Sequence, residues 1–333
     1  MKVLFYARVK DKKLFNDIEF YANDIMILQD LGYDVVLANT VKDLFVHKVD
    51  FYYCWWFGYS ILPLMFSILR NKKIVVTGNV HTVDCKGLKG WPKHKNIIMK
   101  IVMRFSDANI FTSKVEVNRL NGFKANNPHM LYHCVDNRNY NYSKNSPRDN
   151  CIITITQFTL QNIKRKKVLD NILAFKMVLD YCPDAHYYLC GSDGDGVELI
   201  DDFIKEHGLI GNVTIIKNIT KAEKINLLQS SKVYLQQTGC EGFGLAILEA
   251  QACGLPVVTS TDPVLKEVYG DSVIYIDNNI EISKEIIKSF NDAAYLLERI
   301  SKSAINAENF YMESRKNKVR HVLDTCGCGD GAR

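Results

Sequence analysis

Two glutamates, Glu241 and Glu249, bracket a segment that contains Gly242 and Gly244. In a helix, eight positions at about 100° each end roughly 80° beyond two full turns, so Glu249 falls about two turns further on than Glu241. Glycines before a helix let a ligand approach the backbone closely, and the free N–H groups of the first turn favour anions. The segment therefore predicts a phosphate-binding turn with one carboxylate at its mouth and a second placed to accept hydrogen bonds from sugar hydroxyls.

The residues after this turn predict the elements that position it. An apolar, alanine-rich run at 245–252 predicts a short helix, which Gly254 and Pro256 end before a strand at 257–258. Gly244, Leu245 and Ala246 would form the helix start.

The stretch Glu241-Gly-Phe-Gly-Leu-Ala-Ile-Leu-Glu249, with its Ala-Cys-Gly-Leu-Pro-Val-Val tail, resembles the glutamate, seven residues, glutamate motif of family 4 retaining glycosyltransferases. The resemblance covers residues 1 to about 323. It implies a GT-B fold, in which two doubly wound Rossmann-like domains face a cleft and a C-terminal helix crosses back to the first domain. It also implies that Glu241 contacts the transferred sugar, that Glu249 holds the ribose, and that Phe243 and the helix start contact the donor.

A basic run, 164–167, stands after a predicted strand and loop and directly before an amphipathic helix at 168–179. Cations at the carboxyl end of a strand could neutralise a diphosphate. The resemblance implies that Arg165 and Lys166 hold the pyrophosphate of the donor. Thr156-Gln157 replaces the Gly-Arg pair that often follows this strand in the family, and a solvated basic surface is the alternative interpretation.

The segment Gly191-Ser-Asp-Gly-Asp-Gly196 has several possible uses. Backbone with few side chains, beginning at Gly191, can lie against a nucleobase or phosphate. A dinucleotide loop and a calcium loop fit the spacing poorly, since the glycines are misplaced and no Glu stands at position twelve of a loop that begins at Asp193. An Asp-x-Asp metal site at Asp193 and Asp195, as in GT-A glycosyltransferases, and a β-turn without a ligand stay open.

His81 follows a predicted strand at 73–77, which places it in a loop. By resemblance, this imidazole faces the reacting sugar and donates a hydrogen bond to a donor hydroxyl or to the acceptor.

At 333 residues the chain is long enough for two domains, and strands alternating with helices predict parallel, doubly wound α/β sheets. Residues 137–150 have no aliphatic side chain and read as a linker. We expect an acceptor-binding domain at 1–136, followed by this linker and a donor-binding domain at 151–305. A crossover helix at 306–323 and a disordered tail at 324–333, which contains Cys326 and Cys328, should complete the chain.

Charge is shared unevenly. Residues 1–150 hold 22 Lys and Arg against 13 Asp and Glu, whereas the whole chain has a net charge of only +5. The basic stretch 86–104 mixes cations with apolar residues and predicts either contact with an anionic membrane or an ordinary helix packed on the sheet. No nucleic-acid motif accompanies it.

The uncharged run 51–69 is long enough to span a membrane, but Gly58 and Pro63 favour a buried strand, a turn and a helix.

These features together predict a cytoplasmic enzyme, with no secretory signal at Met1. We expect a metal-independent, retaining hexosyltransferase that moves a sugar from a nucleoside-diphosphate sugar, its co-substrate, to a glycan or lipid-linked acceptor, in surface polysaccharide or glycolipid biosynthesis. No cofactor is expected. The alternatives are a metal-dependent glycosyltransferase using Asp193 and Asp195, and a non-catalytic subunit that binds nucleotide sugars.

Overall fold

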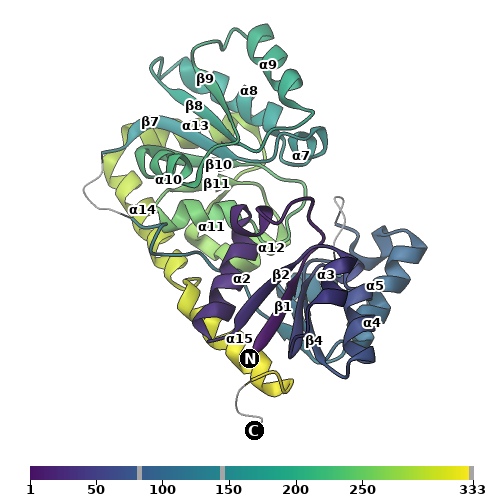
Figure 1. The fold of residues 1–333 in the computed structure, drawn as a ribbon. Coiled ribbons are helices and arrows are strands. Elements are labelled where there is room, and N and C mark those ends of the chain that lie inside the picture. Colours follow the sequence, from purple (N-terminus) through teal and green to yellow (C-terminus); the bar gives the residue numbers. More distant parts are fainter. Residues whose placement is uncertain (81–84, 143–146, 330–333) are drawn as a thin grey trace. The chain divides into compact units, whose positions relative to one another are not determined.

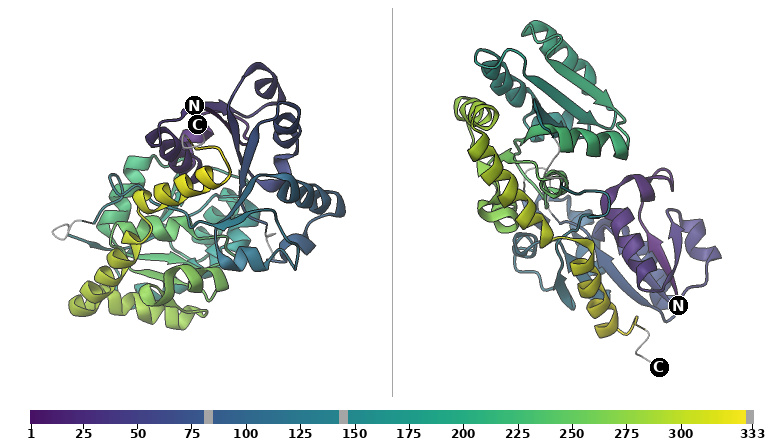
Figure 2. Two further views of the ribbon diagram at one scale, coloured as in Figure 1. Left: turned by 90° about the horizontal axis from the view of Figure 1, so that it is seen from below. Right: turned by 90° about the vertical axis from the view of Figure 1, so that its left-hand side faces the viewer.

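The computed structural model describes residues 1–80, 85–142 and 147–329 (Figures 1 and 2). The chain divides into two compact units. Unit 1 comprises Met1–Cys134 and Phe310–Arg333, and unit 2 comprises Val135–Asn309. Each described unit contains a six-stranded sheet in which all neighbouring strands run parallel. The predicted α/β class with two doubly wound sheets is confirmed.

The sheet of unit 1 has the order β2-β1-β3-β4-β5-β6. Its strands are β1 (Lys2–Tyr6), β2 (Asp34–Ala38), β3 (Phe51–Trp55), β4 (Lys73–Thr77), β5 (Ala108–Phe111) and β6 (Pro128–Met130). The central strand β3 is buried along its whole length, because helices cover both faces of a parallel sheet. The uncharged run at 51–69 thus forms β3, a turn and the helix α4 (Ile61–Leu69), as expected. Among the described residues, no helix combines the length and hydropathy that a membrane crossing needs.

Two helical layers cover the sheet of unit 1. In β1, Val3 and Phe5 pack in one core cluster together with residues of α2 (Glu19–Asp30) and α15 (Met312–Thr325). Leu4 and Tyr6 point the other way, into a cluster formed with α3 (Val41–Val46), α4 and α5 (Lys93–Phe105). The shorter helices of this unit are α1 (Leu14–Asp17), η1 (Phe57–Tyr59), η2 (Gly87–Gly90) and α6 (Lys114–Asn118).

Helix α15 is tied to unit 1 by a buried ion pair. Arg315 donates through Nε to Asp24 of α2 at 2.8 Å, and both side chains are 2% exposed. The same guanidinium donates to the carbonyl oxygens of Leu131 and Tyr132 at 3.1 and 2.7 Å. Figure 2 shows α15 as the last helix of the chain.

The sheet of unit 2 has the order β12-β11-β10-β7-β8-β9. Its strands are β7 (Asp149–Ile155), β8 (His186–Gly191), β9 (Val213–Lys217), β10 (Ser231–Gln236), β11 (Val257–Thr259) and β12 (Ile274–Tyr275). This order is that of a Rossmann fold, and it reverses between β7 and β10. Ligands of such folds bind beyond the carboxyl ends of the strands at this reversal.

The helices of unit 2 follow the strands in alternation. They are α7 (Leu160–Arg165), α8 (Val168–Leu179), α9 (Val197–Glu206), α10 (Lys221–Ser230), α11 (Leu245–Ala252), α12 (Pro263–Tyr269), η3 (Gly270–Ser272), α13 (Asn279–Asn291) and α14 (Ala293–Glu308). Helices α13 and α14 are separated at Asp292. The Asp292 side chain accepts a hydrogen bond from Tyr295 N–H and so caps α14.

The C-terminal segment differs from the expected disordered tail. Helix α15 extends to Thr325, and Gly327 then adopts φ +76°, which turns the chain back so that Cys328 N–H reaches Leu323 O at 2.7 Å. Cys326 and Cys328 are buried in the core of unit 1. A glycine just beyond a helix end therefore explains how residues 326–329 turn back on α15, and residues 330–333 of the predicted tail lie outside the described residues.

Candidate functional site

A cluster of charged side chains lies at the carboxyl ends of β7 and β10, the point where the strand order of unit 2 reverses. Lys166 Nζ donates to the carbonyl oxygen of Ile155, the last residue of β7, at 3.3 Å. It also donates to Oε1 of Gln236, the last residue of β10, at 3.1 Å. The cation thus joins the two strands that flank the predicted ligand crevice.

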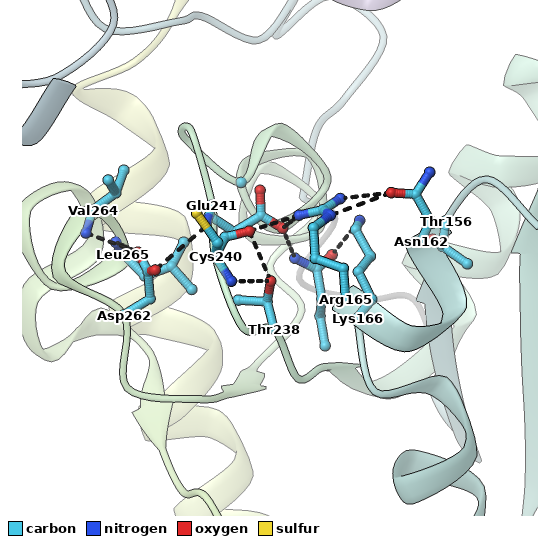
Figure 3. Close-up of polar contacts among 12 residues, drawn as sticks. Thr156, Asn162, Arg165, Lys166, Thr238, Cys240, Glu241, Asp262, Val264 and Leu265 are labelled. Atoms are coloured by element: carbon cyan, nitrogen blue, oxygen red, sulfur yellow. Dashed lines mark hydrogen bonds and ion pairs between the residues drawn. The ribbon is translucent and has the colours of Figure 1, made fainter. Parts of the chain in front are cut away.

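Arg165 and Glu241, predicted separately from the sequence, form an ion pair with Nη1 and Oε1 3.1 Å apart (Figure 3). Arg165 Nη1 also donates to Cys240 O at 2.7 Å, while its Nε and Nη2 donate to Asn162 Oδ1 at 3.2 and 3.1 Å. The expected loop before α8 contains the short helix α7, which ends at Arg165. Several hydrogen bonds therefore fix the direction of this guanidinium.

Gln236 connects the two halves of the cluster and was not singled out from the sequence. Its Nε2 donates to Glu241 Oε1 at 3.1 Å, and its Oε1 accepts from Lys166 and from Tyr234 OH, the latter at 2.8 Å. The side chain is fully buried. A glutamine that directly follows the buried run 233–235 was the signal that could have found it.

The loop that carries Glu241 is held by hydrogen bonds within the loop and to residues that follow β11 (Figure 3). Thr238 N–H donates to Ser260 Oγ at 2.8 Å, and Thr238 Oγ1 donates to Cys240 O at 3.0 Å. Glu241 N–H donates to Asp262 Oδ2 at 3.3 Å, while Asp262 Oδ1 caps α12. The loop is therefore anchored to the carboxyl end of β11 and to the start of α12, which sets the position of the Glu241 carboxylate.

The predicted helix start is present at α11. Gly244 has φ +83°, a conformation that favours glycine, and an added Cβ would lie 2.8 Å from Leu265 Cδ2. The N–H groups of Leu245 and Ala246 precede the first intrahelical hydrogen bond, from Ile247 N–H to Gly244 O at 2.8 Å. They form the anion-favouring end of the helix.

Phe243 and Glu249 lie on either side of this helix start along the chain. Phe243 is 3% exposed, and its ring packs edge-on to Tyr269 at 6.2 Å. Glu249, on α11, pairs with Lys224 of α10 at 3.0 Å, and both side chains are largely buried. The two motif glutamates therefore contact different cations in this structure.

Burial lowers the pKa of Lys166 to about 8. The neighbouring Glu241 and Glu249 carboxylates act in the opposite direction, and Arg165 lowers the pKa further. An ammonium group this poorly solvated would gain strongly from a new anionic neighbour.

The glycines of 191–196 are explained by packing inside unit 2. An added Cβ on Gly191 would lie 1.5 Å from Thr156 O, and one on Gly194 would lie 2.5 Å from Phe158 O. An added Cβ on Gly196 would meet Ile163 Cδ1 at 2.1 Å. The chain beginning at Gly191 thus lies against the loop between β7 and α7, and the close approach is to this chain's own backbone.

The two aspartates of this segment have partners in the fold. Asp195 Oδ1 accepts from Leu160 N–H at 2.9 Å, which caps α7, and Asp193 pairs with Lys217 at 3.6 Å. Within the described parts of the chain, no group of three or more His, Cys, Asp or Glu is arranged to hold a metal ion.

His81 lies outside the described residues. Asn79, two positions before it, lines a pocket of unit 1. The other residues around this pocket include Trp56, Tyr59, Trp91 and Lys95. Trp56 has φ +74°, an unusual backbone conformation for a bulky residue, and it directly follows β3.

Part of the chain matches a family of known proteins. The model of the family described as glycosyl transferases group 1 matches residues 148–307, which lie in unit 2. The O-antigen biosynthesis glycosyltransferase WclY of Escherichia coli is 25% identical over 210 residues, which are 57% of this chain and 54% of that protein. The chain thus matches about half the length of this curated relative.

Solved structures match nearly the whole chain. HepE of Anabaena, in complex with UDP-glucose, superposes with a TM-score of 0.74 at 16% identity, covering 98% of this chain and 100% of that one. Sucrose-phosphate synthase of Thermosynechococcus elongatus gives a TM-score of 0.78 at 15% identity, with coverages of 97% and 98%. At these identities the likeness shows the fold. Residues 148–307 therefore match the group 1 glycosyltransferase family, and the chain has a fold of the GT-B type.

Proposed function

We propose that this protein is a retaining, metal-independent glycosyltransferase that moves a hexose from a nucleoside-diphosphate sugar to a glycan or lipid-linked acceptor in surface polysaccharide biosynthesis. The observation that carries the proposal is the Arg165, Lys166, Gln236 and Glu241 cluster at the strand reversal of a Rossmann-like unit. The likeness to an O-antigen biosynthesis glycosyltransferase supports the polysaccharide context.

The departing diphosphate would be stabilised by groups that are already in place. Negative charge develops on the bridging oxygen as the bond to the sugar breaks, and preorganised cations and N–H groups lower the energy of that state. Arg165 and Lys166 would supply the cations, and Leu245 and Ala246 the N–H groups. Neutralisation by these residues removes the need for a metal, and the partners of Asp193 and Asp195 favour a structural role for both carboxylates.

Glu241 would bind the hydroxyls of the transferred sugar, and Glu249 the ribose. The hydrogen bonds from Arg165 and Gln236 hold the Glu241 carboxylate in one orientation, as positioning of a substrate requires. We assign neither glutamate as a covalent nucleophile. In this scheme the acceptor hydroxyl attacks the face from which the diphosphate leaves, so the anomeric configuration is retained.

Unit 1 would bind the acceptor. Its pocket at Trp56 and Trp91 offers aromatic faces next to the polar Asn79, a combination suited to a sugar ring, and His81 follows in the chain. Association with the cytoplasmic face of an anionic membrane through 86–104 belongs to the same proposal.

The first test is thermal unfolding with UDP, GDP, ADP, CMP and their sugar conjugates in the presence of EDTA. A ligand at a hundred times its Kd adds about 2.7 kcal/mol of stability. We expect one nucleotide to raise the Tm, and Lys166→Ala to abolish the effect. Lys176→Ala, which removes an exposed lysine of α8, serves as the matched control and should leave the shift intact.

A shift that appears only after a divalent metal is restored would refute the metal-independent scheme. A shift without release of nucleotide in the presence of candidate acceptors would instead indicate a binding subunit. Retention is tested separately, by determining the anomeric configuration of the product.

A further inference from the structure

Large apolar side chains are exposed on the outer side of the α3, α4 and α5 layer of unit 1. Nine of the nineteen exposed large hydrophobic residues in the described chain lie on these three helices, which shows concentration rather than random scatter. They are Val41, Phe45 and Val46 on α3, Met65, Ile68 and Leu69 on α4, and Ile97, Ile101 and Phe105 on α5. We call these residues the α3–α5 face.

The residues of each helix fall into a stripe. On α4, Met65, Ile68 and Leu69 are spaced by three and four positions and are 52%, 64% and 78% exposed. On α5, Ile97, Ile101 and Phe105 recur every fourth position. The opposite sides of both helices are already buried on the sheet, so these stripes add a second apolar surface that the core does not use.

The three helices form one continuous support. The rings of Phe45 and Phe66 join α3 to α4 edge-on, with centroids 4.6 Å apart. Arg70, at the end of α4, lies over the Phe66 ring and donates to Phe45 O at 3.0 Å and to His47 O at 2.8 Å. Helix α4 also packs against α5, and Figure 1 shows them together on the same side of the unit 1 sheet. The apolar stripes therefore belong to one surface.

Positive charge accompanies these stripes. Helix α5 carries Lys93, Lys95, Lys100 and Arg104, all exposed, and has no acidic residue. On α3, the carboxylate of Asp43 pairs with Lys12 at 3.0 Å. Long cationic side chains beside exposed apolar residues are the pattern of a surface that lies in the headgroup region of a bilayer.

We propose that the α3–α5 face docks this protein on an anionic phospholipid bilayer, with the apolar stripes entering the interface and the flanking cations binding lipid phosphates. This extends the contact expected from 86–104 alone to three helices and adds an apolar component. Charge favours lipid over a second copy of the chain, because a symmetric contact through this face would bring α5 cations close to one another. The proposal does not depend on the donor site.

Sedimentation with vesicles tests it on the full chain. We expect binding to vesicles of about two parts phosphatidylcholine to one part phosphatidylglycerol, and at least about tenfold weaker binding to phosphatidylcholine alone. No binding to the anionic vesicles would overturn the proposal. So would a concentration-dependent dimer, seen by light scattering, that disappears with the apolar substitutions described next.

The apolar component is tested by Ile68→Ser, Leu69→Ser, Ile97→Ser and Phe105→Ser combined. Net charge is unchanged, so purely electrostatic binding would be unaffected. We expect vesicle binding to fall by at least about tenfold, because burying such side chains is strongly favourable. Unchanged binding would show that the stripes do not enter the bilayer.

The control combines Ile280→Ser, Leu297→Ser and Ile305→Ser, three comparably exposed residues of unit 2. It should bind vesicles like the wild type, and an equal loss would refute the assignment to the α3–α5 face. Unfolding curves establish that each variant is folded, and the exposed positions make this the expected result.

The electrostatic component is tested by Lys93→Gln, Lys100→Gln and Arg104→Gln combined. Each cation near an anionic surface contributes a factor of about five in partitioning, so we expect a loss of about a hundredfold at low salt. Salt should weaken wild-type binding more than binding of this variant. Equal salt sensitivity would contradict a role for these cations.

Discussion

The lowered pKa of Lys166 predicts that donor binding takes up a proton. In the free protein this pKa is about 8, because burial removes water from the ammonium group. A bound diphosphate would place negative charge next to Nζ and raise the pKa again. Only the protonated lysine then binds the diphosphate well, so affinity should fall as the pH rises through 8.

The size of the effect follows from this value. A group with a pKa of about 8 is about 90% protonated at pH 7 and about 10% protonated at pH 9. The Kd of the best-binding nucleoside diphosphate should therefore rise about tenfold between these pH values, equivalent to about 1.4 kcal/mol. At pH 8 about half a proton should be taken up for each ligand bound.

Isothermal titration calorimetry measures both quantities when it is repeated in buffers of different ionisation enthalpy. Lys166→Arg is the control, because guanidinium stays charged throughout this range. The Kd of the Lys166→Arg variant for the nucleotide, even if higher than that of the wild type, should change much less with pH. A change in Kd that both proteins share reports ionisation of the ligand. A wild-type Kd that is flat from pH 7 to 9, or one that changes in parallel with Lys166→Arg, would refute the reasoning.

Three further predictions concern the fold and the support of the site. Gln236→Leu should reduce turnover in initial-rate assays by about ten- to a hundredfold, because it removes hydrogen bonds to two charged groups; an unchanged rate would contradict its positioning role. Arg315→Met should lower the free energy of unfolding in urea by about 3–5 kcal/mol, since it leaves Asp24 buried without its cation, and a loss below about 1 kcal/mol would contradict this. Gly191→Ala should lower the Tm clearly, whereas Gly239→Ala, whose Cβ would meet nothing closer than 3.7 Å, should not; equal Tm values would disprove the packing explanation.

Local sequence was sufficient for the fold class and for the motif. The strand at 51–55 is an uninterrupted apolar run because both of its faces are buried, and such runs alternating with helices specify parallel sheets. The helix start at Gly244 was equally readable, since a turn, a helix and a stop signal lie within fifteen consecutive residues. These properties depend on neighbours in the chain.

Contacts between distant segments were decided only by the tertiary structure. Gln236 gains its role because β7 and β10 are adjacent, although 70 residues separate it from Lys166. Gly191 lies so close to Thr156 that a side chain would clash with it, a constraint that its local sequence does not reveal. Position in the sheet, which no local pattern encodes, determined both.

The sequence by itself determined which residues carry charge, which can form a helix start, and that the chain folds as two parallel α/β sheets. Only the tertiary structure decided that Arg165 pairs with Glu241, that Lys166 is buried enough to change its pKa, and that three separate helices present one apolar surface. The physical reason is that local backbone preference acts over a few residues, whereas burial and electrostatics depend on every atom that folding brings near.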